Sequence, residues 1–386
     1  MSRKSGVKRS DVEIAIICAL PTEARAIQKL MENTSNDTVG NPDYSGATKT
    51  QPDENAYTLG EMDGHPVVLV HMPSVGKISA TFASTHLKHT YTAIKLALLA
   101  GICGGVPKNG DEVKRRLGDV VIGTSVVQFD MGRQYPDKFE QSEHSQALLG
   151  KPSVEIQAFI KKLESSKEVL QQRMQTTITE NIATGFRLAD DLYDATYWHI
   201  HRDADCCIQD EKICDTARRS TCESLHCDDL DRREKRTELK PIIHFGPVGC
   251  GDTVMKSGTH RDNLAKGSKV IALDMEGAGT SMHQACLFVK SISDYADSHK
   301  NKDWQEHASL ASAACVKAII GQWHLSDKSA LKSQVCSKIP FDGVVDCSLI
   351  SQAVRIQNVT VKDSAMVSMV AQDPVLHNAT FNLGHG

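Results

Sequence analysis

The chain has 386 residues, a formal net charge of -4 at pH 7 and 24% charged residues, which is the composition of an ordinary globular protein. A nucleic-acid-binding domain would usually be strongly basic, so this balance favours no nucleic-acid partner. No apolar run reaches the roughly 18 residues of a membrane-spanning helix, so we expect no membrane partner either.

The N-terminal part of the chain predicts alternating strands and helices. Residues 1–10 are basic and polar without the apolar segment of a secretory signal, so we expect a flexible tail, a cytoplasmic protein and mostly reduced cysteines. Pro21 stands at an early helical position, where its missing N–H costs nothing. In chain order the patterns predict a strand at 12–20, a helix at 21–31, a loop at 33–55, a hairpin at 57–71, a helix at 79–88, and strands at 96–100 and 118–122.

The residue composition of the chain changes at about residue 140. Residues at about 140–240 predict an insertion, helical at 153–171 and then rich in charge, cysteine and histidine. Strands are expected at 242–248, 270–274 and 287–292, followed by a closing helix at 304–323. Residues 326–386 are expected to be a disordered or β-assembly tail. The sequence thus predicts a single doubly wound α/β domain over residues 11–325, around a mixed, mostly parallel central sheet with a large surface insertion.

Two carboxylates follow successive apolar strands. The string Asp-Met-Glu-Gly-Ala-Gly ends at 279, and Ser-Asp-Tyr-Ala-Asp begins at 293. A buried carboxylate is costly without a partner or a function, so the pair predicts one site. These motifs resemble those of the purine and uridine phosphorylase superfamily, which includes the methylthioadenosine/S-adenosylhomocysteine nucleosidases. The resemblance implies cleavage of the N-glycosidic bond of a purine nucleoside or nucleotide, without an organic cofactor.

The resemblance implies roles for four residues of these motifs. Asp294, with its pKa expected to be raised after an apolar strand, would protonate the purine, and Ser293 would orient it. A helix N-cap is the alternative for both. Glu276 would accept two ribose hydroxyls while Met275 packs on the sugar; a buried ion pair is the alternative for Glu276.

Glu23 bears on the reaction type. It follows the first strand at a helix start, where nucleosidases of this superfamily carry a glutamate that activates water. Phosphorylases usually have a Gly-x-Pro-x-Arg turn there, and a carboxylate beside phosphate would be repulsive. We therefore favour hydrolysis, with phosphorolysis as the alternative. The alternative is a purely structural role, in which Glu23 is a carboxylate of the first helical turn that the helix dipole stabilises.

The remaining candidate positions come from the same resemblance. The third-strand loop has no arginine or hydroxyl at the phosphate positions of the phosphorylases, but its glycines suit close approach to a ligand. Lys77 would lie on the sugar or nucleophile side or be solvated, and Lys290 is expected to be a solvent-side or phosphate-side cation. Phe129 would stack on the base or pack in the core. The full substrate-binding set is Glu276, Met275, Gly101, Ile102, Cys103, Gly104, Phe129, Val248, Gly249, Cys250, Ser74, Lys77 and Lys290.

The insertion resembles one found in fungal members often linked to immune-receptor-like proteins. Its arginines predict contacts to the phosphates of a nucleotide such as ATP, with a solvated, self-paired surface as the alternative. The arginines concerned are Arg218, Arg219, Arg232 and Arg233. Its cysteines lack a clear pair of CxxC knuckles, so we predict no metal and keep zinc as the alternative. A catalytically silent nucleoside sensor stays open, and the resemblance implies a homo-oligomer, dimer or trimer.

Overall fold

The structure is a computed structural model. It describes residues 9–36, 53–110, 112–113, 115–142, 152–182, 189–202, 205–208, 212–228, 230–232, 239–281 and 286–323. The expected C-terminal tail at 326–386 and most of the expected N-terminal tail lie outside these ranges. Within them, no helix combines the length and the apolar character that crossing a membrane requires.

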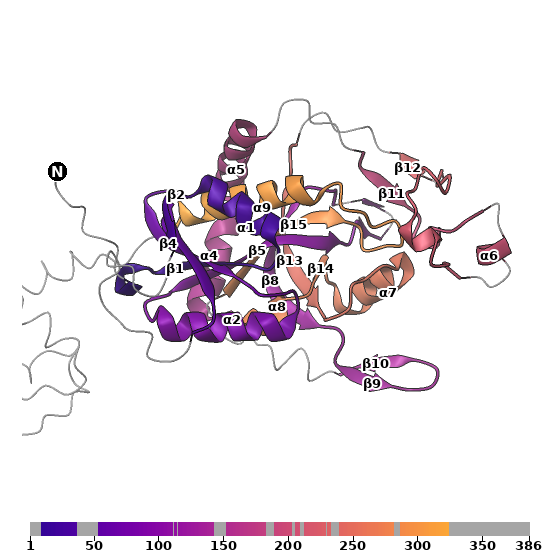
Figure 1. Ribbon diagram of the computed structural model, residues 1–386, viewed down its shortest axis with the longest axis horizontal. Helices are drawn as coiled ribbons and strands as arrows, with labels where there is room; N and C mark the ends of the chain where they lie inside the picture. Colours follow the sequence, from indigo (N-terminus) through magenta and orange to yellow (C-terminus); the bar gives the residue numbers. More distant parts are fainter. Residues whose placement is uncertain are drawn as a thin grey trace, which may run out of the picture. The chain divides into compact units, whose positions relative to one another are not determined.

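A nine-stranded mixed sheet forms the centre of the domain (Figure 1). Its strands, in spatial order, are β14 (Ala272–Asp274), β13 (Ile243–Cys250), β8 (Val120–Gln128), β15 (Cys286–Asp294), β5 (Leu96–Gly105), β1 (Ile14–Cys18), β4 (His65–His71), β3 (Ala56–Met62) and β2 (Glu32–Asn36). β1 pairs in parallel with β4 and β5, and β5 pairs in parallel with β15. β14 also pairs with β5, so the segment from β14 to β5 closes on itself.

The apolar runs of the sequence form this sheet because they are covered on both faces. β1 is buried at every residue, as expected for a central strand. The predicted hairpin is confirmed between β3 and β4, with positive φ at both Asp63 and Gly64 as a tight primed turn requires. The predicted fold class, an α/β fold around a central mixed sheet, is confirmed.

Helices cover both sides of the sheet. α9 (Gln305–Ile320) packs on β5 and β15 and contacts α1 (Pro21–Leu30) and α5 (Lys167–Asn181). α2 (Lys77–Thr90) contacts β4 and α8 (Gly277–Ser281). Figure 1 shows α1 and α9 above the strands and α2 and α8 below them. The other regular helix of the core region is α4 (Val154–Ser165), and α7 (Gly258–Ser268) follows β13.

Two predicted segments differ in detail. The single helix expected at 153–171 is two helices, because the chain turns at Ser166 and α5 continues to Asn181. Leu163 and Leu170 of these helices are fully buried in the main core, so this part of the predicted insertion belongs to the packed domain. Residues 33–36 of the expected loop instead belong to the edge strand β2 (Glu32–Asn36).

The surface part of the insertion contains little regular structure. It holds β11 (Asp191–Tyr193) paired with β12 (Leu230–Arg232), the one-turn helix α6 (Asp205–Ile208) and the 3-10 turn η2 (Ala217–Arg219). A second short 3-10 turn, η1 (Arg9–Asp11), precedes β1. Two further small hairpins join β6 (Lys108–Asn109) to β7 (Glu112–Val113) and β9 (Gly132–Gln134) to β10 (Phe139–Gln141).

Candidate active site

The site forms where parallel strands end. β1, β5 and β15 run in the same direction, and their carboxyl ends carry Glu23, Gly101 to Gly104, and Asp294. In the β5–β15 ladder, Lys290 lies opposite Gly101 and Asp294 lies opposite Gly104. Three residues of a strand span about 10 Å, so Lys290 and Asp294 lie about this far apart along β5. Ligands of open α/β sheets bind at this edge.

Glu23 is held rigidly at the start of α1. Its side chain is buried, and its Oε2 accepts the N–H groups of Ala19 at 2.9 Å and Leu20 at 2.8 Å. Its Oε1 accepts the N–H of Ile102 at 2.8 Å, which ties α1 to the end of β5. Burial raises the pKa of Glu23, while Lys290 and the N–H donors oppose the rise. The result is a fixed carboxyl group with raised proton affinity.

This approach of Glu23 to β5 requires glycine at position 101. A Cβ added to Gly101 would lie 2.0 Å from Oε1 of Glu23, and its φ of +150° is one that other residues rarely adopt. The N–H of Gly101 donates to the hydroxyl of Ser312 at 3.0 Å, and this hydroxyl donates to the carbonyl of Val289 at 2.9 Å. The loop backbone is therefore fixed from both sides.

Glu276 lies in a buried ionic cluster. The ammonium group of Lys290 donates to Oε2 of Glu276 at 2.6 Å and also to Asp274, and the N–H of Gly76 donates to Oε1 of Glu276 at 3.1 Å. The expectation of a solvent-side or phosphate-side cation at Lys290 is corrected, because this side chain is 2% exposed and bridges two carboxylates. The buried-pair alternative for Glu276 therefore holds in this structure.

The charges of this cluster shift one another's protonation. Burial acts against the charged form of Lys290, but Asp274, Glu276 and Glu23 outweigh it and raise the pKa of the lysine. Burial raises the pKa of Asp274. Burial also acts to raise the pKa of Glu276, but the adjacent ammonium group lowers it overall. Glu276 is thus anionic at neutral pH and keeps its ability to accept hydrogen bonds.

Asp294 ends β15 in a network of three donors. Ser293 donates its hydroxyl to Oδ2 at 2.9 Å, which is the orienting contact expected of it. Lys300 donates to the same oxygen at 2.8 Å, and the N–H of Ala296 donates to Oδ1 at 3.0 Å. The described chain after Asp294 forms turns up to α9, so the expected alternative of capping a directly following helix does not apply.

A cavity of about 480 Å³ reaches Asp294. The segment 293–301 lines one wall, and the insertion lines the other with Tyr193, His199, Arg218 and residues 220–223. Glu23 and Glu276, which are 2% and 4% exposed, do not line this cavity. The three predicted carboxyl groups therefore converge on one end of the sheet, while only Asp294 opens to this space.

The other predicted ligand-contacting residues surround the same region. Cys103 and Gly104 are buried in β5, and the carbonyl of Cys103 accepts the Ser293 hydroxyl at 3.4 Å. Met275 is half-buried directly before Glu276. Val248, Gly249 and Cys250 are buried at the end of β13. Phe129 lies against that strand end, where a Cβ at Gly251 would come within 2.6 Å of its ring.

Ser74 and Lys77 flank the start of α2. The Lys77 ammonium group binds both oxygens of Asp130 at 2.6 and 2.7 Å and lies 3.4 Å from Asp252. The backbone N–H of Lys77 also donates to Asp252 at 2.9 Å. Ser74 is exposed, and its hydroxyl bonds with that of Ser79 at 2.6 Å. Lys77 thus joins the end of β8, the end of β13 and the Gly76 turn that contacts Glu276.

The four arginines of the insertion differ in their position relative to the cavity at Asp294. Arg218 lines the cavity at Asp294 and pairs with Asp215 at 3.2 Å, while Arg219 is exposed and is not among the lining residues. The side chain of Arg232 and the whole of Arg233 lie outside the described residues.

Sequence reasoning missed two charged residues at the site. Asp274 and Lys300 contact the predicted carboxylates or their partners directly. Asp274 also accepts the N–H groups of Glu276 and Gly277, which shapes the turn into α8. Asp274 stands within the quoted motif, so its position after a buried strand was a usable signal.

Comparison with known proteins assigns the family. The model of the phosphorylase superfamily matches residues 13–321, so the chain belongs to this superfamily of nucleoside phosphorylases and nucleosidases. The resemblance predicted from the two carboxylate motifs is confirmed. A curated relative, a nucleotide-binding leucine-rich repeat (NLR)-like protein from Hyaloscypha variabilis, is 29% identical over 327 residues, which is 82% of this chain and 30% of the relative. The chain therefore spans less than a third of that relative's length.

The solved structures to which the chain is similar include two bacterial enzymes. The 5'-methylthioadenosine/S-adenosylhomocysteine nucleosidase from Neisseria meningitidis, in complex with methylthio-immucillin-A, is 17% identical with a TM-score of 0.47, covering 80% of this chain and 99% of the other. Futalosine hydrolase from Helicobacter pylori is 15% identical with a TM-score of 0.46, covering 81% and 99%.

Proposed function

We propose that this protein hydrolyses the N-glycosidic bond of a purine nucleoside or nucleotide. In this reaction the oxygen of water bonds to the anomeric carbon as the carbon–nitrogen bond breaks. The electron pair passes to the base, which takes a proton from Asp294, while Glu23 takes a proton from the water. Membership of the phosphorylase superfamily and the gathering of these groups at one end of the sheet support the proposal.

The charges around Glu23 favour water over phosphate as the nucleophile. Glu23, Asp274 and Glu276 are three buried carboxyl groups that share one buried cation, Lys290. Lys290 already donates to two of them. A phosphate ion brought beside Glu23 would add negative charge to this cluster in a low-dielectric site, whereas water adds none. Glu23, with its raised pKa, is suited to accept the proton of water.

Glu276 retains capacity to hold ribose. Each carboxylate oxygen offers about two acceptor positions. Oε1 uses one for the N–H of Gly76 and Oε2 uses one for Lys290, so each oxygen can accept one further hydroxyl group. Hydrogen bonds to an ionised carboxylate are stronger than neutral ones, so two ribose hydroxyls would be bound and oriented together.

Substrate binding at Asp294 requires a rearrangement. Oδ2 of Asp294 already accepts from Ser293 and from Lys300, so a purine that binds this oxygen has to displace the ammonium group. Ser293 and the N–H of Ala296 keep the carboxyl group in place while Lys300 leaves. Glu23 and Glu276 also have to become accessible, since neither lines the cavity at Asp294.

A nucleotide is the second candidate substrate. Arg218, Lys256 and Lys300 line the cavity beside Asp294, and such cationic side chains bind phosphate groups. The cavity is also lined by four further acidic residues: Asp191, Glu223, Asp297 and Asp303. Arg218 is exposed and already paired with Asp215, which is why we place the nucleotide second.

The test compares adenosine, inosine and ATP as substrates, each with and without phosphate. We expect free base and free ribose, or free adenine and ribose 5'-triphosphate from ATP, without any need for phosphate. Strict phosphate dependence with ribose 1-phosphate as product would replace hydrolysis by phosphorolysis. Base release from ATP alone would select the nucleotide, and binding without base release would leave a silent sensor.

Two variants assign the roles. Asp294→Asn and Glu23→Gln should each lower kcat by about 10²–10⁴-fold, the usual contribution of a positioned acid or base. Glu168→Gln, on the exposed face of α5, is the matched control and should keep full activity. Wild-type turnover in Asp294→Asn would remove the assigned acid, and retained water-dependent turnover in Glu23→Gln would remove the assigned base.

A further inference from the structure

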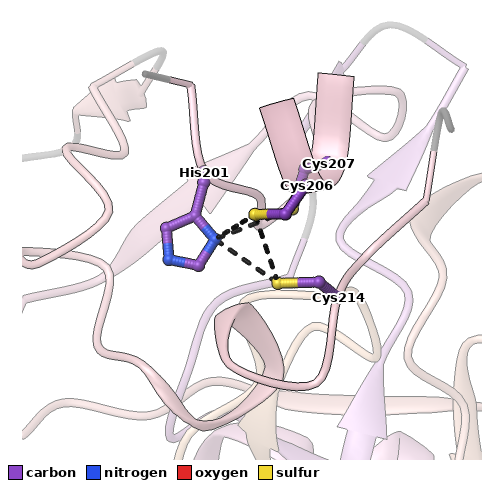
Figure 2. A group of neighbouring side chains, drawn as sticks. All are labelled: His201, Cys206, Cys207 and Cys214. Atoms are coloured by element: carbon purple, nitrogen blue, oxygen red, sulfur yellow. Dashed lines mark hydrogen bonds between the residues drawn. The ribbon is translucent and has the colours of Figure 1, made fainter. Parts of the chain in front are cut away.

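We propose that His201, Cys206, Cys207 and Cys214 bind a structural zinc ion within the insertion. Figure 2 shows the three sulfur atoms gathered around Nδ1 of His201. Cys206 and Cys207 come from α6, and Cys214 comes from the segment before η2. All four ligand atoms lie within 4.8 Å of one another. Three thiolates and one imidazole are a ligand set typical of structural zinc sites.

The distances between these atoms match a tetrahedral zinc site. Bonds of about 2.3 Å to sulfur and about 2.0–2.1 Å to nitrogen give tetrahedral edges of about 3.8 Å between sulfurs and about 3.6 Å between sulfur and nitrogen. Nδ1 of His201 lies 3.5, 3.7 and 3.4 Å from the sulfurs of Cys206, Cys207 and Cys214. The sulfur of Cys206 lies 4.0 Å from that of Cys207 and 3.8 Å from that of Cys214.

Hydrogen bonding alone does not account for this arrangement. One ring nitrogen carries a single proton or a single lone pair, so it cannot form three good hydrogen bonds to three thiols. A cation at the centre interacts with all four atoms at once. The sulfur of Cys214 also accepts the N–H of Ala217 at 3.3 Å, an outer contact that orients and stabilises a metal-bound thiolate.

The fold of the insertion supplies a reason for a metal. In the described part of the insertion, its own core consists of five buried residues, Tyr193, Cys207, Ala217, Leu225 and Cys227, with five partly buried ones packed against them. A core this small rarely holds a segment together without a disulfide or a metal. The ten cysteines in the described part of the chain are all free. The described part of α6 has four residues, far fewer than an isolated helix needs in water.

A disulfide is the competing explanation for close cysteines. Its sulfur atoms lie about 2.05 Å apart, whereas the sulfur of Cys206 lies 3.8 Å from that of Cys214 and 4.0 Å from that of Cys207. Disulfide formation would also need an oxidant and would leave one cysteine and His201 over. Zinc binding uses all four side chains and releases the protons of three thiols.

The site would organise one wall of the cavity at Asp294. Arg218 and residues 220–223 line that cavity, and they follow Cys214 by only a few residues. The zinc ion would therefore fix the segment that faces the substrate without touching the substrate itself. Because this role is structural, zinc content tests it independently of catalysis.

The experiment measures zinc per chain in the full-length protein, expressed with added zinc and purified without chelator. The double variant Cys206→Ser/Cys214→Ser should lose one zinc ion per chain relative to wild type. His201→Cys should keep that ion, because four thiolates also form a tetrahedral site. His226→Asn and Cys286→Ser, an exposed histidine of the insertion and a cysteine outside it, are the matched controls and should keep it too.

A second readout protects the test against misfolding. The thermal transition of the α/β core should survive in the double variant, while the insertion should be cleaved faster by trypsin. Cobalt bound in place of zinc should show thiolate charge-transfer bands that weaken in the double variant. Wild-type protein without zinc, unchanged zinc in the double variant, or a Cys206–Cys214 disulfide in freshly purified protein would each overturn the proposal.

A separate observation carries a second metal site, formed by His199, Cys227 and His299. These three groups are buried and their ligand atoms lie within 4.8 Å of one another. Neither ring nitrogen of the buried His299 has a hydrogen-bond partner among the described residues, although Nδ1 lies 3.7 Å from Asp297. An unsatisfied buried imidazole is costly, and a metal ion would satisfy it.

The neighbouring His199 is also oriented to bind a metal ion. Nε2 of His199 lies 3.0 Å from the carbonyl of Ser220, so this nitrogen carries the proton and donates. That leaves Nδ1 as the free lone pair, and it faces Cys227 at 3.5 Å and Cys222 at 3.7 Å. Such a carbonyl contact on the far nitrogen is typical of metal-binding histidines. The geometry points to zinc held by His199, Cys227 and His299.

This second ion would link the insertion to the segment that follows Asp294, because His299 belongs to that segment. Wild type should then contain two zinc ions per chain, Cys227→Ser one, and Cys227→Ser combined with the Cys206/Cys214 double variant none. Wild type with one ion, lost in the Cys206/Cys214 variant, would overturn the second site and leave the first. Unchanged zinc in Cys227→Ser would likewise overturn the second.

Discussion

Lys290→Met removes the cation that the buried carboxyl groups of Asp274 and Glu276 share. The ammonium group lies 2.6 Å from Glu276 and also binds Asp274, and the side chains of all three residues are at most 5% exposed. Methionine fills a similar volume but leaves the carboxylates without their counter-charge. Breaking a buried ion pair from one side costs about 3–5 kcal/mol, so the unfolding equilibrium should shift by roughly 10²–10⁴-fold.

Urea denaturation measures this change. With a slope of about 2 kcal/mol/M, a loss of about 4 kcal/mol lowers the unfolding midpoint by about 2 M. The loss should be smaller when Glu276→Gln is combined with Lys290→Met, because one of the uncompensated charges is then removed. Lys161→Met is the control: its exposed pair with Glu164, at 2.6 Å, should contribute less than about 1 kcal/mol.

A result close to the control would refute the reasoning. If Lys290→Met costs less than about 1 kcal/mol, the cluster does not depend on its cation, and the charge argument against phosphate beside Glu23 fails with it.

Three further predictions concern single positions. Gly101→Ala should lower stability by about 1–3 kcal/mol and abolish base release, because its Cβ would strike Glu23; unfolding and activity assays check this, and wild-type values would contradict the packing. Burial lowers the pKa of His71 in the folded state below its ordinary value of 6.5. The stability that the neutral His71 side chain contributes is therefore present above pH 6.5 and is lost as the pH falls through the pKa of the folded state. Stability measured at about pH 7.5 and about pH 5.5 should therefore fall less in His71→Gln than in wild type, and an equal fall would oppose the assignment. Ser293→Ala should lower kcat more than it raises KM, because it frees Asp294 to rotate; a change in KM alone would assign the hydroxyl to binding.

Local patterns were sufficient for the main elements. The apolar run at 14–18 forms the fully buried strand β1, and Asp63 and Gly64 form the turn of the β3–β4 hairpin. Both features could be predicted because their signals lie in residues that are neighbours in sequence. Ser166 shows the limit of this reasoning. The helical period continues through it, but the chain turns there and α4 and α5 pack as separate helices on the core.

The chain by itself specified the superfamily and the positions of most strands along the sequence, because the carboxylate motifs and apolar runs are contiguous in sequence. It also identified Glu23, Glu276 and Asp294, which the fold brings to one end of the sheet. Only the tertiary structure decided what these groups contact. Lys290 is buried between Asp274 and Glu276, and the cysteines and histidines of the insertion meet in three dimensions without a regular spacing. Ion pairing and metal geometry depend on distances between segments, and no local pattern encodes those distances.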